Sequence, residues 1–287
     1  MNPQKIALLA DSCCDVPAKE AAEKGFFLVP LRILGADGEH ADGVDIFSPD
    51  VYRRQAAGET LKTSLPSGQA VEGVLDQIKA QGYEKVIALM LSSGLSGTYN
   101  LLRITAAART DLEIAVYDTK SGSLAIGMMI FQLLEDIEGG MGWEELTARR
   151  APQLIANTFP FFSVDTLDYL QKGGRIGRIT AMAGTMLNIK PILSFAEDGQ
   201  LKNVAKVRGM KQVREKYLQT IRDLKGAHKR FNLAVANGGA PEHMTVLRAQ
   251  MEEAFPGYDH FWAGEIGATL SVYIGPGILG AGIMILD

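Results

Sequence analysis

The chain has 287 residues, of which 47% are hydrophobic and 22% are charged, and its formal net charge is −4 at pH 7. This composition is typical of a globular protein with a sizeable core. The length favours two domains, with one large α/β domain as the competing interpretation. The basic residues are scattered along the chain, which argues against nucleic-acid binding. No run of 18 apolar residues is present, so we expect no stable insertion into a membrane.

The N-terminal segment and the cysteines indicate a cytoplasmic protein. The apolar run before Asp11 is too short for a secretory signal and is expected to form a first core strand. Cys13 and Cys14 are the only cysteines. Neighbouring cysteines rarely bridge, so no disulfide framework is expected, as is usual in a reducing compartment.

The first half of the chain alternates between strands and helices. Strands are expected at 6–10, 26–33, 85–91 and 113–118. Helices are expected at 17–24, from Ser48 onward, from Ser67 or Gly68 to Gly82, and at 98–109, 122–138 and 143–157. This alternation predicts a parallel sheet with helices on both faces, and therefore a three-layer α/β/α domain over residues 1–157.

The second half follows a different pattern. Glu197-Asp198-Gly199 lies between two apolar segments and is a strong hairpin signal. Strands are expected at 190–195, 201–207, 231–236, 258–265 and 282–286, with helices at 211–224 and 242–255. A hairpin combined with βαβ pieces predicts a mixed sheet, and therefore a two-layer α/β domain over residues 158–287.

Hydroxyl side chains gather in two loops where strands of the first half are expected to end. These loops are 63–67, which begins Thr63-Ser64, and 92–98, which includes Ser93, Ser96, Gly97 and Thr98. In an open parallel sheet, ligands bind beyond the carboxyl ends of the strands. A helix N-terminus offers free N–H groups and a positive partial charge, which suit an anion. Each cluster taken alone is also explained by helix capping, but two clusters together favour a ligand.

The anion is expected to be a singly charged carboxylate. A phosphate-binding P-loop carries a lysine, and the loop from Gly94 to Thr98 has none. A catalytic serine needs a base, and the four histidines lie outside the expected strand-end loops. No metal-ligand spacing of His, Cys or carboxylates is present, so no metal and no cofactor is expected.

Three further segments have ordinary structural interpretations. The stretch 275–280 fits the dinucleotide fingerprint, but it precedes a strand and is expected to be a tight turn. Arg175 follows a helix that ends at paired glycines, and it either forms a local salt bridge or reaches the cleft. The stretch 179–192 includes Met182, Met186 and Leu187 and is expected to be core, although flexible thioethers also suit the lining of a lipid pocket.

The motifs together resemble the DegV family of bacterial fatty-acid-binding proteins. The matching segments occur in family order over nearly the whole chain. They are Asp11-Ser12 with Asp15-Val16, Lys62-Thr63-Ser64 with Pro66, Ser92 to Tyr99, Gly173-Gly174-Arg175-Ile176, Lys190-Pro191-Ile192, and Gly275-Pro276-Gly277. Each motif is weak alone, whereas the set is highly specific.

The resemblance implies two α/β domains with a long-chain fatty acid bound between them. Thr63 and Ser96 match the family residues that bind the carboxylate, and Arg175 and Arg208 match two family arginines. The family often has histidine at two positions, which are Tyr273 and Asn237 here. Family members present the bound acid to a dihydroxyacetone-kinase-like enzyme that phosphorylates it, so a fatty acid kinase is a possible partner.

We therefore expect a binding protein rather than an enzyme, with a long-chain fatty acid as its ligand. The expected ligand-binding residues are Thr63, Ser64, Ser93, Ser96, Gly97, Thr98, Arg175, Arg208 and Tyr273. Two alternatives stay open. One is a hydrolase or acyl-transfer enzyme that uses Ser93 or Ser96, and the other is a binder of small carboxylates or phosphorylated metabolites.

Overall fold

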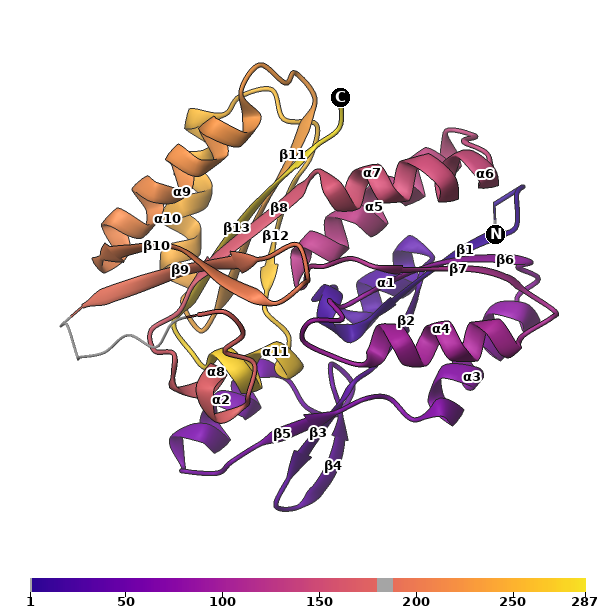
Figure 1. Cartoon of the computed structure of the whole chain (residues 1–287), viewed down its shortest axis with the longest axis horizontal. Coiled ribbons are helices and arrows are strands. Elements are labelled where there is room, and N and C mark those ends of the chain that lie inside the picture. The colour runs from indigo at the N-terminus through magenta and orange to yellow at the C-terminus, as the bar shows by residue number, and fades with distance from the viewer. Residues whose placement is uncertain (1, 180–187) are drawn as a thin grey trace.

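The first half of the chain forms a parallel sheet between two layers of helices (Figure 1). The computed structural model describes residues 2–179 and 188–287. The strand order is β2-β1-β6-β7, with bounds β1 Ile6–Asp11, β2 Phe27–Val29, β6 Lys85–Met90 and β7 Glu113–Asp118. Helices α3 (Gly68–Ala80) and α4 (Thr98–Ala108) cover one face. Helices α1 (Ala18–Lys24) and α5 (Leu124–Glu138) cover the other, so the predicted three-layer arrangement is confirmed.

The prediction of one strand over 26–33 was wrong. The segment is divided into β2 and a separate strand β3 (Arg32–Gly35), with Pro30 between them. Proline has no N–H to donate to a sheet, so pairing is interrupted there. Strand β3 pairs with β4 (Gly38–Ala41) and with β5 (Lys62–Ser64) in a small antiparallel sheet. Thr63 therefore lies on a strand of this small sheet rather than in a loop of the parallel sheet.

The second half forms a six-stranded mixed sheet, as predicted. Its order is β10-β9-β8-β13-β11-β12. The bounds are β8 Thr158–Ser163, β9 Ile189–Phe195, β10 Leu201–Arg208, β11 Phe231–Gly238, β12 Phe261–Glu265 and β13 Ile278–Ile285. Helices α9 (Gly209–Lys225) and α10 (Pro241–Ala254) pack on one face of this sheet. Strands β9 and β10 form the predicted hairpin, in which Gly199 has a φ of 78°.

Helix α5 packs between the two sheets. Its residues contact strands β1 and β6 of the first sheet and strands β8, β11, β12 and β13 of the second. Nearly the whole of its circumference is buried, including Ile126, Met129 and Ile130. One hydrophobic cluster therefore extends from the first sheet through α5 to the second. This shared helix fixes how the two sheets face each other, and a cavity lies in the space beside its first turn.

The remaining helices connect the sheets and close their edges. Helix α2 (Ser48–Ala56) packs against α11 (Ala268–Ile274), and α11 also contacts the short helix α8 (Asp168–Lys172). Helices α6 (Trp143–Glu145) and α7 (Ala151–Ala156), joined by a π-helical turn at Leu146–Arg150, precede β8. A 3-10 turn at Ser12–Cys14 follows β1. Strand β8 and helix α11 were not predicted from the sequence, whereas α8 is the helix that was expected to end at the paired glycines before Arg175.

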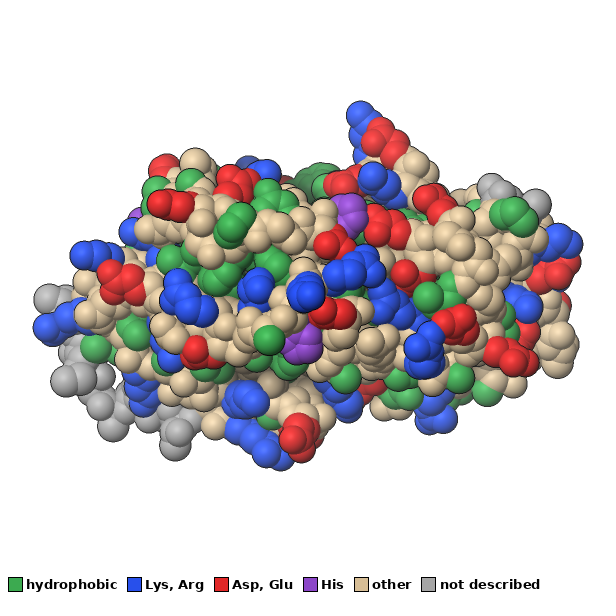
Figure 2. Space-filling model, turned by 90° about the horizontal axis from the view of Figure 1, so that it is seen from above, with side chains coloured by type: hydrophobic (Ala, Val, Ile, Leu, Met, Phe, Trp, Pro, Cys, Tyr) green, Lys and Arg blue, Asp and Glu red, His purple; other side chains and the backbone are tan. Residues whose placement is uncertain are grey.

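The surface seen in Figure 2 carries acidic and basic side chains interspersed among one another, rather than one continuous basic stripe. Across residues 2–179 and 188–287, no helix is long and apolar enough to cross a membrane.

Candidate functional site

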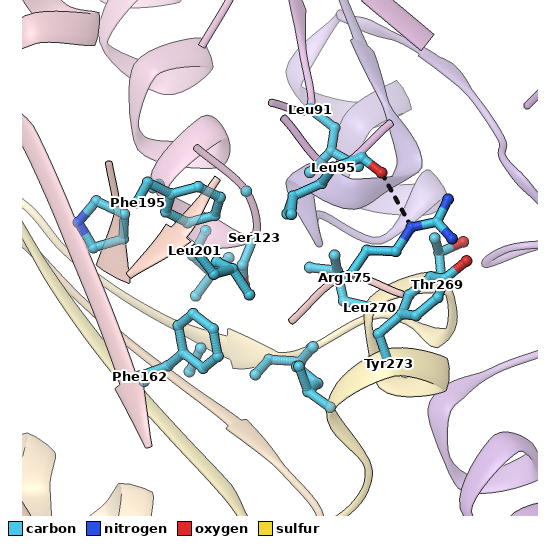
Figure 3. A pocket seen from close by; sticks show the side chains of 18 of the residues that line it. Leu91, Leu95, Ser123, Phe162, Arg175, Phe195, Leu201, Thr269, Leu270 and Tyr273 are labelled. Atoms are coloured by element: carbon cyan, nitrogen blue, oxygen red, sulfur yellow. Dashed lines mark hydrogen bonds between the residues drawn. The ribbon is translucent and has the colours of Figure 1, made fainter. Parts of the chain in front are cut away.

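A largely apolar cavity lies where the first sheet, the second sheet and α11 meet (Figure 3). It has about 1190 Å³ of unoccupied space, including its open mouth. The loops after β5 and β6 line one side, the first turn of α5 lines another, and the second sheet forms the floor. Among the described lining residues, Arg175 is the only one with a charged side chain.

Small residues on the two central strands of the second sheet create the floor of the cavity. Ala234 of β11 lies opposite Gly282 of β13, and Ala236 lies opposite Gly280. All four residues line the cavity. Alternate residues of a strand point to opposite faces, and on the other face these strands carry large side chains packed against α9 and α10. The lack of side-chain volume on one face leaves space beside α5.

Aromatic and aliphatic side chains form the walls. Phe162 stands on β8, while Phe195 and Leu201 flank the β9–β10 hairpin, and Figure 3 shows these three side chains at one side of the cavity. Leu91 and Leu95 enter from the loop after β6. These walls offer an alkyl chain dispersion contacts and exclusion from water, and they offer it no charge.

The polar end of the cavity lies at α11. Figure 3 shows Tyr273 and Thr269 near the guanidinium group of Arg175. The Tyr273 hydroxyl lies 2.5 Å from Thr63 Oγ1, which joins α11 to β5. The Arg175 guanidinium carbon lies 4.8 Å from the centre of the Tyr273 ring. Arg175 also donates from Nε to the Leu95 carbonyl at 3.3 Å and from Nη1 to the Gly173 carbonyl at 2.8 Å.

The start of α4 supplies the second hydroxyl group at the mouth. Gly97 precedes α4 as its N-cap residue, and both Ser96 and Gly97 line the cavity. Ser96 Oγ lies 2.8 Å from Thr98 Oγ1 and accepts the Thr98 N–H at 3.3 Å. Thr98 is buried and does not line the cavity, so it supports Ser96 from behind.

The other predicted site residues are divided between the cavity and its surroundings. Ser64 lines the cavity, and its hydroxyl donates to the Leu65 carbonyl at 3.3 Å. Ser93 does not line it, and its Oγ accepts from Lys120 Nζ at 3.2 Å. Arg208 is exposed at the end of β10 and does not line the cavity. Asn237 is buried outside the cavity, where its Oδ1 accepts the Ala240 N–H just before α10.

Three buried carboxyl groups lie behind α11. Asp42 accepts the Ala268 N–H at 3.1 Å and the Ser12 hydroxyl at 2.8 Å, so it joins the loop after β1 to the start of α11. Burial raises the pKa of Asp42 and, more strongly, the pKa of Asp15. Burial also raises the pKa of Asp11 to about 7, although two backbone N–H groups oppose the rise. These three carboxyl groups support the wall of the cavity from behind, but they do not themselves line the cavity.

Within the described ranges, Ser96 Oγ is hydrogen-bonded to the Thr98 hydroxyl and Ser93 Oγ to Lys120 Nζ, and neither bond is to a histidine or a carboxylate. Residues 2–179 and 188–287 contain no cluster of three potential metal ligands. The basic side chain beside Ser93 is Lys120, whose ammonium group is paired with Asp118 at 2.7 Å. A protonated, ion-paired amine has no free lone pair with which to accept a proton from the serine.

Sequence reasoning missed Leu270, Thr269 and the four floor residues. The floor has a recognisable signal, because Ala or Gly occupies alternate positions in the apolar strands LAVANG and ILGAGIMI. The stretch 179–192 was expected to be core, and Ile179 and Ile192 are buried. Met182, Met186 and Leu187 lie outside the described residues.

Known proteins are similar to this chain in sequence and in fold. Residues 5–286 match the model of the DegV family. A DegV domain-containing protein of Clostridium perfringens is 34% identical over 281 residues, which is 98% of each chain. A fatty-acid-binding DegV family protein from Thermus thermophilus is 28% identical, covers 100% of both chains and superposes with a TM-score of 0.91. A stearic-acid-binding protein from Eubacterium ventriosum is 25% identical over 98% of both chains, with a TM-score of 0.86.

Proposed function

The chain belongs to the DegV family, and we propose that its cavity binds a long-chain fatty acid with the carboxylate at the α11 end. The observation that carries this proposal is the contrast within the cavity. One cationic side chain and several hydroxyls gather at one end, and the rest of the described lining is almost wholly apolar. A fatty acid has the same division between a single anionic group and a long alkyl chain.

The alkyl chain supplies most of the affinity. Burying about fifteen methylenes contributes on the order of 12 kcal/mol before the cost of ordering the ligand is subtracted. Polar contacts add less, because the carboxylate exchanges hydrogen bonds with water for hydrogen bonds with protein. Their main effect is to fix which end of the ligand lies at α11.

Thr63, Ser96 and Arg175 are the residues that we assign to the carboxylate. The hydroxyls of Thr63 and Ser96 line the same cavity and each can donate one hydrogen bond. Arg175 brings the charge that an anion needs once it leaves water. Tyr273 is hydrogen-bonded to Thr63 and lies under Arg175, so it holds both of them in place.

A titration experiment distinguishes a fatty-acid-binding protein from the two alternative functions, a binder of small carboxylates and a hydrolase. Delipidated protein is titrated with palmitate, with palmitate methyl ester and with butyrate. Fatty acid binding predicts tight association of palmitate, weaker association of the ester and no measurable binding of butyrate. Tight binding of butyrate would identify a site for small carboxylates, and turnover of activated esters would identify a hydrolase.

We further propose that the bound acid is presented to a dihydroxyacetone-kinase-like partner, a role that rests on the family resemblance. Tyr273 stands where the family often has histidine. A histidine can carry charge near neutral pH, whereas a phenol stays uncharged there. Phosphorylation of the bound acid by a family kinase should therefore be slow in the wild type and faster in Tyr273→His. Rapid acyl-phosphate formation by the wild type, unchanged in the variant, would show that the histidine is dispensable.

A further inference from the structure

We propose that two adjacent rows of small residues on β11 and β13 set the length of alkyl chain that the cavity holds. This inference rests on the proposed function and extends it, because it states which residues limit the length of the bound alkyl chain. The first row is Ala236 with Gly280, and the second is Ala234 with Gly282. In each row the two residues are direct cross-strand neighbours and both line the cavity.

One of the two rows lies nearer the polar end of the cavity, and the other lies further from it. Gly275 is the C-cap residue of α11, and strand β13 begins three residues after it. The row of Ala236 and Gly280 therefore lies nearer the polar end. The row of Ala234 and Gly282 lies two residues further along the strands, about 7 Å deeper at the usual rise per residue. A chain that enters from α11 therefore passes the first row before the second.

The floor ends where the next pair of side chains on the same face becomes large. Met284 lies opposite Asn232, both residues are buried, and neither lines the cavity. Asn232 is held in place, because its Nδ2 donates to Gln132 Oε1 at 3.1 Å and its Oδ1 accepts the His260 N–H at 2.9 Å. The cavity thus has a fixed stop beyond the second row.

A Cβ added at either glycine of the rows would make no contact closer than ordinary van der Waals distance. A Cβ at Gly282 would lie 3.4 Å from Met128 Cε, its nearest neighbour, which is an ordinary van der Waals contact. A Cβ at Gly280 would lie 3.6 Å from Ala236 Cβ. Neither glycine has a positive φ. Neither a positive φ nor a close contact of the added Cβ therefore requires glycine at these two positions, both of which line the cavity.

The experiment measures selectivity between dodecanoic and octadecanoic acid with delipidated full-length protein. Gly282→Val should lower the affinity for octadecanoic acid about tenfold or more and change that for dodecanoic acid about threefold or less, because only the longer chain reaches the second row. Gly280→Val blocks the nearer row and should weaken both acids. Met284→Ala removes the stop and should shift the preference towards acids longer than octadecanoic acid.

Ala263→Val is the matched control, since Ala263 is an exposed residue of β12 in the same sheet, and it should alter neither affinity. Ala234→Val fills the second row from the opposite strand and decides the question if Gly282→Val does not fold. Second-row variants that melt like the wild type and bind both acids unchanged, or weaken both equally, would overturn the inference and leave the proposed function standing. Wild-type protein that binds neither acid would overturn both.

Discussion

Thr63 and Tyr273 are held in place by one another before any ligand arrives. Their hydroxyls lie 2.5 Å apart, and Arg175 packs over the tyrosine ring. An entering carboxylate can accept from groups that are already ordered, so little further side-chain entropy is lost on binding. The phenol of Tyr273 contributes to this order through its hydrogen bond with the neighbouring threonine.

The hydroxyls of Thr63 and Ser96 can be tested singly. Thr63→Val or Ser96→Ala should weaken fatty acid binding by about 1–3 kcal/mol, because a buried charged acceptor loses one donor. Isothermal titration with oleate measures the change. Ser93→Ala is the control, since Ser93 lies outside the cavity lining. If the control loses affinity while both cavity variants bind normally, the carboxylate has been assigned to the wrong hydroxyls.

Arg175 should contribute more to the affinity for a charged ligand than to the affinity for a neutral ligand with the same alkyl chain. Arg175→Gln should weaken binding of oleate but leave the binding of oleyl alcohol within about twofold, since the neutral headgroup has no charge to compensate. Competition with a fluorescent fatty acid measures both ligands. Equal weakening of the acid and the alcohol would mean that Arg175 acts only as a packing residue over Tyr273.

Whether a site residue could be predicted from the sequence depended on how close it lies in the chain to the other residues of its motif. Ser96 and Gly97 were identified because a strand, a hydroxyl-rich loop and a helix follow one another within one short segment. Tyr273 and Arg175 join Thr63 at the cavity only through tertiary packing. Tyr273 was therefore predicted from the family resemblance alone, and for Arg175 the resemblance favoured the cleft over the alternative of a local salt bridge. Arg208 was predicted in the same way, and the structure places it on an exposed strand end away from the cavity lining.

Helix α11 is the element that completes the site, and its N-terminus is hydrogen-bonded to a buried carboxyl group. Asp42 binds its first N–H, while Tyr52 Oη and Gln55 Nε2 of α2 bind Ser271 Oγ and the Val272 carbonyl. The sequence did not predict α11, because its seven residues include the β-branched Thr269, Val272 and Ile274. Such residues favour strands. Packing against α2 and α8 makes the segment helical instead, and no local pattern reports that packing.

The buried carboxyl groups make stability depend on pH. The pKa of Asp11 is raised by burial from the ordinary value of 3.8 to about 7. Its contribution to stability is therefore fully present below about pH 4 and is lost as the pH rises through 7. Such a rise corresponds to roughly 4 kcal/mol in favour of the protonated form. Burial raises the pKa of Asp15 and Asp42 too, so their contributions change in the same direction.

Urea unfolding at pH 5 and at pH 8 measures this effect. The free energy of unfolding should fall between these two values in the wild type, and Asp11→Asn should show a smaller fall. Asp223→Asn removes an exposed carboxyl group and should leave the fall unchanged. A wild type that is more stable at pH 8 than at pH 5, with the same dependence in Asp11→Asn, would refute this account of the cluster.

On the scale of the whole molecule, the two sheets share α5, and the cavity opens beside its first turn. The alternation of strands and helices predicted the parallel sheet, and the 197–199 turn predicted the hairpin of the mixed sheet. The family resemblance is confirmed by the match over residues 5–286. Helix α5 itself was predicted over residues 122–138, but its position between the two sheets was not, since an apolar helix buried on all sides has the same sequence pattern whichever sheets cover it.

A ligand that touches both sheets and α11 should stabilise the whole fold. At a free concentration one hundred times its dissociation constant, such a ligand adds about 2.7 kcal/mol to the free energy of unfolding. Delipidated protein should therefore melt at a lower temperature than the same protein reloaded with oleate, as calorimetry would measure. Oleate methyl ester is the matched ligand control and should restore less of the difference. An unchanged melting temperature on reloading would mean that the acid does not bind the folded protein in preference to the unfolded chain.

The most direct test of the central claim is the identity of the ligand that the protein carries when it is purified. Native mass spectrometry gives the mass added to the folded chain, and extraction into organic solvent followed by chromatography identifies the molecule. We predict a long-chain fatty acid, present at about one per chain and exchangeable for added palmitate or oleate, since one cavity with one polar end holds one such molecule. Protein that is empty on purification and takes up neither acid would contradict the account.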